Sequence, residues 1–355
     1  MQRWLHDVSA NIDELVRSGR RISLRSLEFH PGLTCPLRCR FCHTMRDRNS
    51  IYGTSPPPDQ VLTIDEFKSI LSTFKDCGGS QFILSGGLEP FMSPISIEAL
   101  RAAYGLGLST TVYTSGLGRF LTIEHLPDIV FHSRRLRFSI SAATSATYRM
   151  VQVPQMPQDA AGEAFARVRK LMRTAAQLAD GTNTRVGQQF LLQGDNNREW
   201  LDALAYAAQA GAKFFDLRLD VVPERTLQSE LLAEISEAVA TARGWFPTVD
   251  LELRENNRNH LAPLYCHAWK TSLVVDAFGG VHVCCIVADQ PAHFRPFGLG
   301  YVRSGDNFSE LIDTLEHTGV EISQCAVCAD RTWVFNAAIE ARGRQQGSEF
   351  TPFPV

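Results

Sequence analysis

CPLRCRFC, residues 35–42, places Cys35, Cys39 and Cys42 in a C-x3-C-x2-C run, with the aromatic Phe41 directly before the last cysteine. Three thiolates this close can hold three corners of one cubic iron–sulfur cluster, although a [4Fe–4S] cluster normally takes four. The missing ligand would leave one iron open to a small molecule with an amine and a carboxylate. A zinc knuckle and a disulfide are the alternatives, but zinc requires a fourth Cys or His at a regular spacing. The adjacent histidine is poorly placed for that role, because consecutive residues seldom both reach one ion.

The cysteine run resembles the signature of the radical SAM enzymes, down to the aromatic residue before the third cysteine. This resemblance implies a [4Fe–4S] cluster on Cys35, Cys39 and Cys42 that chelates S-adenosylmethionine (SAM), with Phe41 beside the cofactor. It also implies reductive cleavage of SAM to a 5'-deoxyadenosyl radical, which abstracts hydrogen from the substrate. An external one-electron donor of the flavodoxin or ferredoxin type is then expected.

Composition is that of an ordinary globular protein, with 355 residues, 44% of them hydrophobic and 21% charged, enough for one large domain or two. The formal net charge of −3 argues against nucleic acid held by a broad basic surface. The densest basic cluster, Arg134, Arg135 and Arg137, flanks a predicted strand, and we interpret it as a solvated strand edge. We expect no membrane span and no signal peptide, hence a cytoplasmic protein. Reduced cysteines there favour metal ligation over disulfides.

Strand and helix patterns alternate along most of the chain, which predicts an α/β fold. Strands are predicted at residues 25–33, 81–85, 109–114, 136–141, 185–192 and 214–222. Helices are predicted to begin at a Thr63–Glu66 capping box and at Ser93–Pro94, and then near 122–131, 159–179, 197–210 and 227–243. Six β-then-α units imply a parallel sheet curled into a partial (β/α)6 barrel. Its active site is expected at the carboxyl ends of the strands, where the cysteine run follows the first strand.

The domain organisation is predicted from a change in pattern near residue 255, where the polar stretch RENNRNH begins. We expect an N-terminal helix over 1–24 and the partial barrel over 25–254. A small cysteine-rich extension with a β-hairpin and a helix is expected over 255–335. A C-terminal helix and tail, 336–355, follow it.

Two further stretches resemble elements with which the radical SAM family binds SAM. SGGLEP, 85–90, resembles the family's Gly-Gly-x-Glu-Pro element, which implies that the cosubstrate's amino group is held by Gly86, Gly87 and Glu89. SISA, 139–142, ends the fourth predicted strand, so its two serines share a face. The resemblance implies that the carboxylate or ribose of SAM is bound by Ser139, Ser141 and Arg149. Two serines on a half-exposed strand and a surface salt bridge of the arginine are the alternatives.

Candidate substrate contacts lie on the third, fifth and sixth predicted strands. Tyr113 and Gln189 put polar groups towards the expected mouth of the barrel. Asp216, Arg218 and Asp220 alternate along the sixth strand, so all three share one face. Charged groups directed into a barrel need partners or a polar ligand. These residues predict a hydrophilic substrate, and a mutually paired ion network is the alternative.

A second cysteine set occupies the last hundred residues. SLVVDAFGGVHVCC is predicted to form a hairpin that leads to Cys284 and Cys285. From the residues alone, zinc suits a four-thiolate site here as well as iron–sulfur does. The C-x12-G-x4-C and C-x2-C arrangement resembles the one-cluster twitch form of the twitch or SPASM extension. That resemblance implies an auxiliary [4Fe–4S] cluster on Cys266, Cys284, Cys325 and Cys328.

The adjacent Cys285 is expected to point the opposite way along its strand from Cys284, the ligand that the glycine spacing favours. A free thiol there is a candidate hydrogen donor to a substrate radical, as in an epimerase. A buried inert thiol is the alternative.

The leading functional prediction is a radical SAM enzyme with one auxiliary cluster that oxidises or otherwise converts a small polar metabolite. The substrate would be a sugar, aminocyclitol or nucleoside, because the layout resembles the twitch-type aminocyclitol dehydrogenases of antibiotic biosynthesis. Three alternatives remain: maturation of a ribosomal peptide, an epimerase that uses Cys285, and a non-catalytic iron–sulfur or zinc protein. The short N-terminus and the missing second auxiliary cluster argue against peptide maturation.

Overall fold

The computed structural model describes residues 22–42, 61–219, 227–254, 266–288 and 298–318, together with residues 336 and 339. Asp220, Cys325 and Cys328 lie outside these residues, as do residues 1–21 of the expected N-terminal helix and all but residues 336 and 339 of the expected C-terminal helix and tail. The chain divides into two compact units. We call His30–Thr54 with Phe82–Asn256 the sheet unit, and Met1–Phe29 with Ser55–Gln81 and Asn257–Val355 the hairpin unit.

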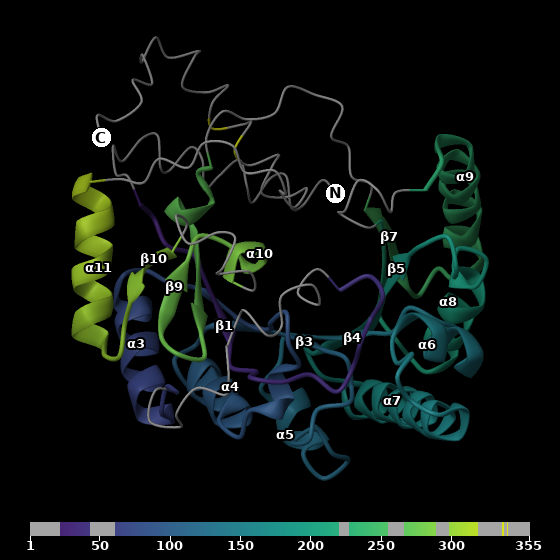
Figure 1. Ribbon diagram of the computed structural model, residues 1–355, viewed down its shortest axis with the longest axis horizontal. Helices are drawn as coiled ribbons and strands as arrows, with labels where there is room; N and C mark the ends of the chain where they lie inside the picture. Colours follow the sequence, from purple (N-terminus) through teal and green to yellow (C-terminus); the bar gives the residue numbers. More distant parts are fainter. Residues whose placement is uncertain are drawn as a thin grey trace. The chain divides into compact units, whose positions relative to one another are not determined.

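The sheet unit is built on strands that follow one another in chain order: β2 (Gln81–Leu84), β3 (Ser109–Thr114), β4 (Arg135–Ser139), β5 (Arg185–Leu192), β6 (Phe214–Leu219) and β7 (Asp250–Arg254). Every pair from β3 to β7 is parallel, and among the described strands β7 pairs with β6 alone, so the barrel is open there. The connecting helices are α4 (Ser96–Gly105), α5 (Leu126–Phe131), α6 (Ser145–Val151), α7 (Gln158–Leu178), α8 (Trp200–Gln209) and α9 (Ser229–Trp245) (Figure 1). The predicted α/β fold is confirmed.

The two faces of these strands differ in chemistry because successive side chains alternate sides. One face is apolar, and it packs against α7 and α8 through fully buried residues that include Phe138, Val186, Phe190 and Leu217. Burial of each such side chain stabilises the fold by about 1.5–3 kcal/mol. The opposite face carries arginines on β4 and an aspartate and an arginine on β6, so the polar side chains gather on the face away from the helices.

Three elements differ from the sequence-based expectation. α6 and β7 are additional elements that the hydrophobic pattern did not indicate. The helix expected at Ser93–Pro94 begins later, because Pro90–Met92 forms a short 3-10 helix and the Ser96 hydroxyl donates to the carbonyl of Pro90 at 2.6 Å.

The hairpin unit contains β1 (Ser26–His30), α3 (Ile64–Asp76), β8 (Ser272–Asp276), β9 (Gly280–His282), α10 (Cys285–Ala288), β10 (Gly298–Tyr301) and α11 (Gly305–Thr318). The predicted hairpin is confirmed: β8 and β9 pair antiparallel, and Gly279 takes a φ of 81° in the turn. The Thr63–Glu66 capping box is also confirmed, and Arg303 donates to Glu66 at 2.7 and 2.8 Å. No helix in the described part of the chain is long and apolar enough to cross a membrane.

Candidate functional site

The cysteine loop, residues 35–42, is held by the segment that ends α6. The backbone N–H of Arg38 donates to the carbonyl of Gln152 at 3.0 Å, and that of Arg40 donates to Val151 at 2.9 Å. The side-chain amide of Gln155 donates to the carbonyl of Pro36 at 2.8 Å. The loop backbone is therefore fixed by the protein itself.

The three thiols of the loop are half-buried neighbours. Burial, and then the nearby Glu89 carboxylate, raise the pKa of Cys35 to about 12. Burial, and then the thiols of Cys42 and Cys35, raise the pKa of Cys39 well above its usual value. Among the described residues, no three His, Cys, Asp or Glu side chains lie at metal-ligand spacing. The donor set itself fits an iron–sulfur cluster, because soft thiolates are its usual ligands.

A glycine-lined turn, residues 85–90, lies against the chain that leads to the cysteine loop. Gly86 has a φ of 153°, a conformation essentially restricted to glycine. A Cβ placed on Gly32 would lie 2.6 Å from the carbonyl oxygen of Glu89. Two backbone segments thus approach each other more closely than side chains would allow. Such a cradle suits a bound group that must reach backbone atoms.

Glu89 lies near the end of this turn and is only 3% exposed. Its carboxylate accepts hydrogen bonds from the Phe91 N–H at 3.2 Å and the Thr114 hydroxyl at 2.7 Å. It also accepts from the N–H and the hydroxyl of Ser115, at 2.7 and 2.6 Å. Burial raises the pKa of Glu89, although these donors oppose the shift. An ionised carboxylate has about four acceptor sites, and these four hydrogen bonds occupy them. Because the donors lie in the turn and at the end of β3, Glu89 joins these two segments.

Gln152 is a site residue that no sequence pattern indicated. Its side chain is 1% exposed, accepts from the N–H of Ser141 at 2.7 Å and donates to the carbonyl of Ser139 at 3.1 Å. It also hydrogen-bonds the thiol of Cys39, which works against the rise in that thiol's pKa. One side chain therefore joins the cysteine loop to the SISA segment.

The other predicted SAM contacts are partly engaged by the protein. β4 ends at Ser139, so Ser141 lies beyond the strand, and its hydroxyl accepts from the N–H of Leu191 at 3.0 Å. Arg149 is exposed on α6 and donates to the carbonyl of Met156 at 3.0 Å. The roles of these residues towards SAM stay predictions, as do those of Phe41, Gly86, Gly87 and Glu89.

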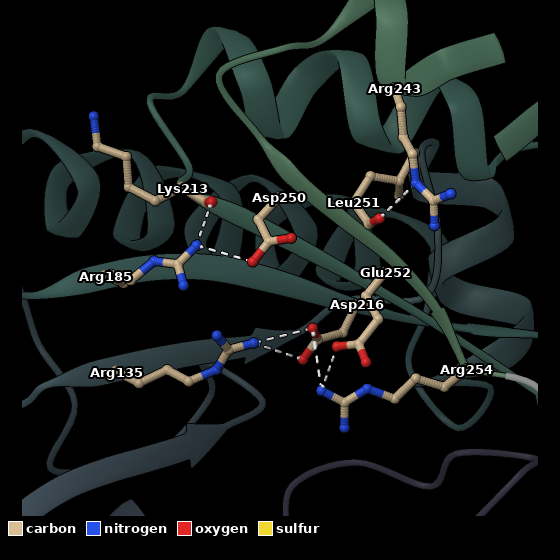
Figure 2. Close-up of polar contacts among 9 residues, drawn as sticks. All are labelled: Arg135, Arg185, Lys213, Asp216, Arg243, Asp250, Leu251, Glu252 and Arg254. Carbon is tan, nitrogen blue, oxygen red and sulfur yellow. Dashed lines mark hydrogen bonds and ion pairs between the residues drawn. The ribbon is translucent and has the colours of Figure 1, made fainter. Parts of the chain in front are cut away.

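The basic cluster at the start of β4 is not a solvated strand edge, so that interpretation was wrong. Arg134 is exposed, but Arg137 is only 7% exposed. Arg135 reaches Asp216 on β6, with its guanidinium 3.0 Å from both carboxylate oxygens (Figure 2). The guanidinium of Arg137 lies 3.4 Å above the Tyr113 ring.

Apart from Asp220, which lies outside the described residues, the remaining predicted substrate residues lie in the same region. Gln189 on β5 pairs in register with both Ser139 and Asp216, and Arg218 lies two residues after Asp216 on the same face of β6. The structure thus brings together the described polar residues that were predicted on the third, fifth and sixth strands.

The second cysteine set is described only in part. Cys266, Cys284 and Cys285 are half-buried in the hairpin unit. The expectation that Cys285 alternates with Cys284 along a strand is wrong, because β9 ends at His282 and Cys285 begins α10. The choice between them as ligand stays a prediction.

Comparison with known proteins identifies a family and a fold. The family model of the Radical SAM superfamily matches residues 30–233. The fold is similar to that of SuiB from Streptococcus suis bound to S-adenosylmethionine, with a TM-score of 0.60 and 15% identity over 88% of this chain and 68% of that one. It is also similar to anSMEcpe with bound AdoMet, with a TM-score of 0.56 and 12% identity over 83% of this chain and 81% of that one. At these identities the structural likeness shows the fold alone.

Proposed function

Because the chain belongs to the radical SAM superfamily, we propose that it binds SAM at a [4Fe–4S] cluster held by Cys35, Cys39 and Cys42. The observation that carries this proposal is the cysteine loop, anchored on residues 151–155 in the same unit as the glycine cradle. When bound, the cluster and SAM would supply a 5'-deoxyadenosyl radical that abstracts hydrogen from the substrate. Reduction of the cluster requires an external one-electron donor.

The chain's own residues would position the cysteine loop and the glycine-lined turn, and the cysteine thiols would release protons. Gly32 and Gly86 let two backbone segments approach closely, and Glu89 fixes the turn between them through its four donors. Gln152 holds the loop against residues 139–141. Cluster ligation requires that the thiols lose their protons, so the raised pKa values of Cys35 and Cys39 make iron binding release protons at neutral pH.

We further propose that Cys266, Cys284, Cys325 and Cys328 hold an auxiliary [4Fe–4S] cluster and that the reaction is the oxidation of a small polar metabolite. The confirmed β8–β9 hairpin supports this, because it leads directly to Cys284. A closed set of four thiolates suits electron transfer, and net oxidation needs an electron acceptor. Iron analysis tests the proposal: the reconstituted protein should hold about eight iron atoms per chain. Cys266→Ala should hold about four, whereas four in the unsubstituted protein would contradict it.

Peptide maturation is the second candidate function. It is favoured by similar folds that were solved with peptides, namely SuiB with the precursor peptide SuiA and anSMEcpe with the Cp18Cys peptide. Anaerobic assays with SAM and dithionite separate the two functions. Formation of 5'-deoxyadenosine that rises with sugar, aminocyclitol or nucleoside substrates supports metabolite oxidation. A rise that occurs only with peptides supports maturation.

A further inference from the structure

An excess of positive charge is gathered on the polar face of β4, β6 and β7. Among the described residues, four guanidinium groups meet two carboxylates there, a surplus of two positive charges within that set: Arg135, Arg137, Arg218 and Arg254 against Asp216 and Glu252. The parallel register places Asp216 beside Glu252 and Arg218 beside Arg254. These groups therefore form one cluster.

Both carboxylates of the cluster are already paired. Asp216, whose side chain is 3% exposed, accepts from Arg135 at 3.0 Å and lies 3.6 Å from the guanidinium of Arg254. Arg254 also donates to Glu252 at 2.9 Å. Figure 2 shows Asp216 between the two arginines. This part of the cluster is a mutually paired ion network.

Arg137 and Arg218 form the surplus. Neither makes an ion pair with a carboxylate in the described part of the chain, and the Nε of each is buried without a hydrogen-bond partner there. Burial, and then the nearby Arg218, lower the pKa of Arg137 to about 9. Burial, and then Arg254, lower the pKa of Arg218. Stacking on Tyr113 leaves the in-plane N–H groups of Arg137 open, because the ring lies against the face of the guanidinium.

An uncompensated buried charge is costly unless a partner arrives. Guanidinium groups match carboxylate and phosphate oxygens in a two-pronged geometry. The Oε1 atom of Gln189 is also buried without a partner among the described residues, and it lies beside Asp216 in the register. It would accept from a hydroxyl of the same ligand. The cluster thus offers donors for an oxyanion and an acceptor for a neutral polar group.

We propose that this cluster, with Arg137 and Arg218 as its donors, binds an anionic group of the substrate, a carboxylate or a phosphate. The inference rests on the proposed function only in taking the ligand to be the substrate. Arg137 lies two residues before Ser139 on β4. Along a strand this is about 6–7 Å from the residues predicted to bind SAM, and we take the anion to be distinct from the carboxylate of SAM, which the SAM-binding measurement below tests. The substrate is therefore an acidic or phosphorylated polar metabolite.

The test measures binding of simple anions to the full-length chain. Thermal unfolding is followed in chloride buffer with added inorganic phosphate, acetate or neutral glycerol, at constant ionic strength so that screening is equal. The unsubstituted protein should gain stability with phosphate or acetate, and the stronger of the two identifies the group. Arg137→Gln and Arg218→Gln should weaken anion binding about tenfold or more. Arg185→Gln should retain it, because Arg185 is 42% exposed and pairs with Asp250.

Two further readouts separate a ligand site from a structural role. Without added anion, Arg137→Gln should unfold at a higher temperature than the unsubstituted protein, because it removes an uncompensated buried charge. Arg137→Lys keeps the charge and should restore part of the anion binding. The proposal would be overturned if Arg137→Gln and Arg218→Gln bound the anion as strongly as the unsubstituted protein does. It would also be overturned if neither anion stabilised the unsubstituted protein.

A measurement of SAM binding shows whether the arginines bind the carboxylate of SAM or an anionic group of the substrate. Arg137→Gln and Arg218→Gln should bind SAM as the unsubstituted protein does, and weaker SAM binding would assign the arginines to the cosubstrate and overturn the inference. Failure of the proposed function is seen separately, as anion binding without formation of 5'-deoxyadenosine.

Discussion

The hydroxyl of Thr114 donates to the buried carboxylate of Glu89 at 2.7 Å, which ties the turn after β2 to the end of β3. The same carboxylate accepts from Ser115 and Phe91, so one side chain organises the region where the glycine cradle approaches the cysteine loop. Glu89 is therefore a positioning residue even before any ligand binds.

Glu89→Gln should destabilise the iron-free protein by about 1–3 kcal/mol, because an amide nitrogen cannot accept the hydrogen bonds that one carboxylate oxygen now accepts. Urea denaturation measures the loss. Glu163→Gln, on the exposed surface of α7, is the matched control and should change little. If Glu89→Gln unfolds at the same urea concentration as the unsubstituted protein, the carboxylate does not position the turn.

Gln152→Ala should loosen the cysteine loop, because it leaves the Ser141 N–H and the Ser139 carbonyl without their present partner in a buried place. The expected cost is about 1–3 kcal/mol, with lower retention of iron after anaerobic reconstitution and desalting. Gln155→Ala removes only the hydrogen bond to Pro36 and should have a smaller effect. Equal iron retention in both variants would contradict the role of Gln152.

Gly86→Ala should destabilise the protein by about 1–3 kcal/mol, because a φ of 153° is strained for any residue with a Cβ. Gly162→Ala is the opposite control. It lies inside α7, an added Cβ there meets no atom within 4 Å, and alanine is the better helix former by about 1 kcal/mol. Thermal unfolding should therefore shift down for the first variant and up for the second.

Prediction from sequence was most accurate where one element carried a complete local signal. The strand predicted at 185–192 coincides with β5, and the capping box at Thr63 lies where α3 begins. α6 was missed because it has only seven residues and because its N-terminus, besides the local cap of Thr144, is stabilised from a distance by Glu199. No local pattern reports such a partner.

The charged cluster was misinterpreted for the same physical reason. Arg135 precedes its partner Asp216 by 81 positions, so a run of arginines beside a strand resembled a solvated edge. Gln152 was equally hidden, because a glutamine after a short helix gives no indication that it will be buried between two functional segments. Long-range polar pairing was the information that the sequence alone did not supply.

Glu199 predicts a pH dependence of stability. Burial opposes its ionisation, but hydrogen bonds from Thr147, Ala143 and Thr144 outweigh that effect and lower its pKa below 4.5. A carboxylate whose pKa is lower in the folded state stabilises the protein above its unfolded pKa, and this contribution is lost as the pH falls through the folded pKa. Glu199→Gln should therefore lower stability at pH 7 and show a weaker loss between pH 5 and acid. If the stability of Glu199→Gln and that of the unsubstituted protein fell equally as the pH was lowered, the role of Glu199 in this pH dependence would be contradicted.

The most direct test of the central claim is anaerobic reconstitution with iron and sulfide, followed by SAM and dithionite, with 5'-deoxyadenosine as the measured product. We expect the unsubstituted protein to form 5'-deoxyadenosine and a variant with alanine at Cys35, Cys39 and Cys42 to form none. Formation of 5'-deoxyadenosine by that triple variant, or a reconstituted protein that takes up zinc but no iron, would contradict it.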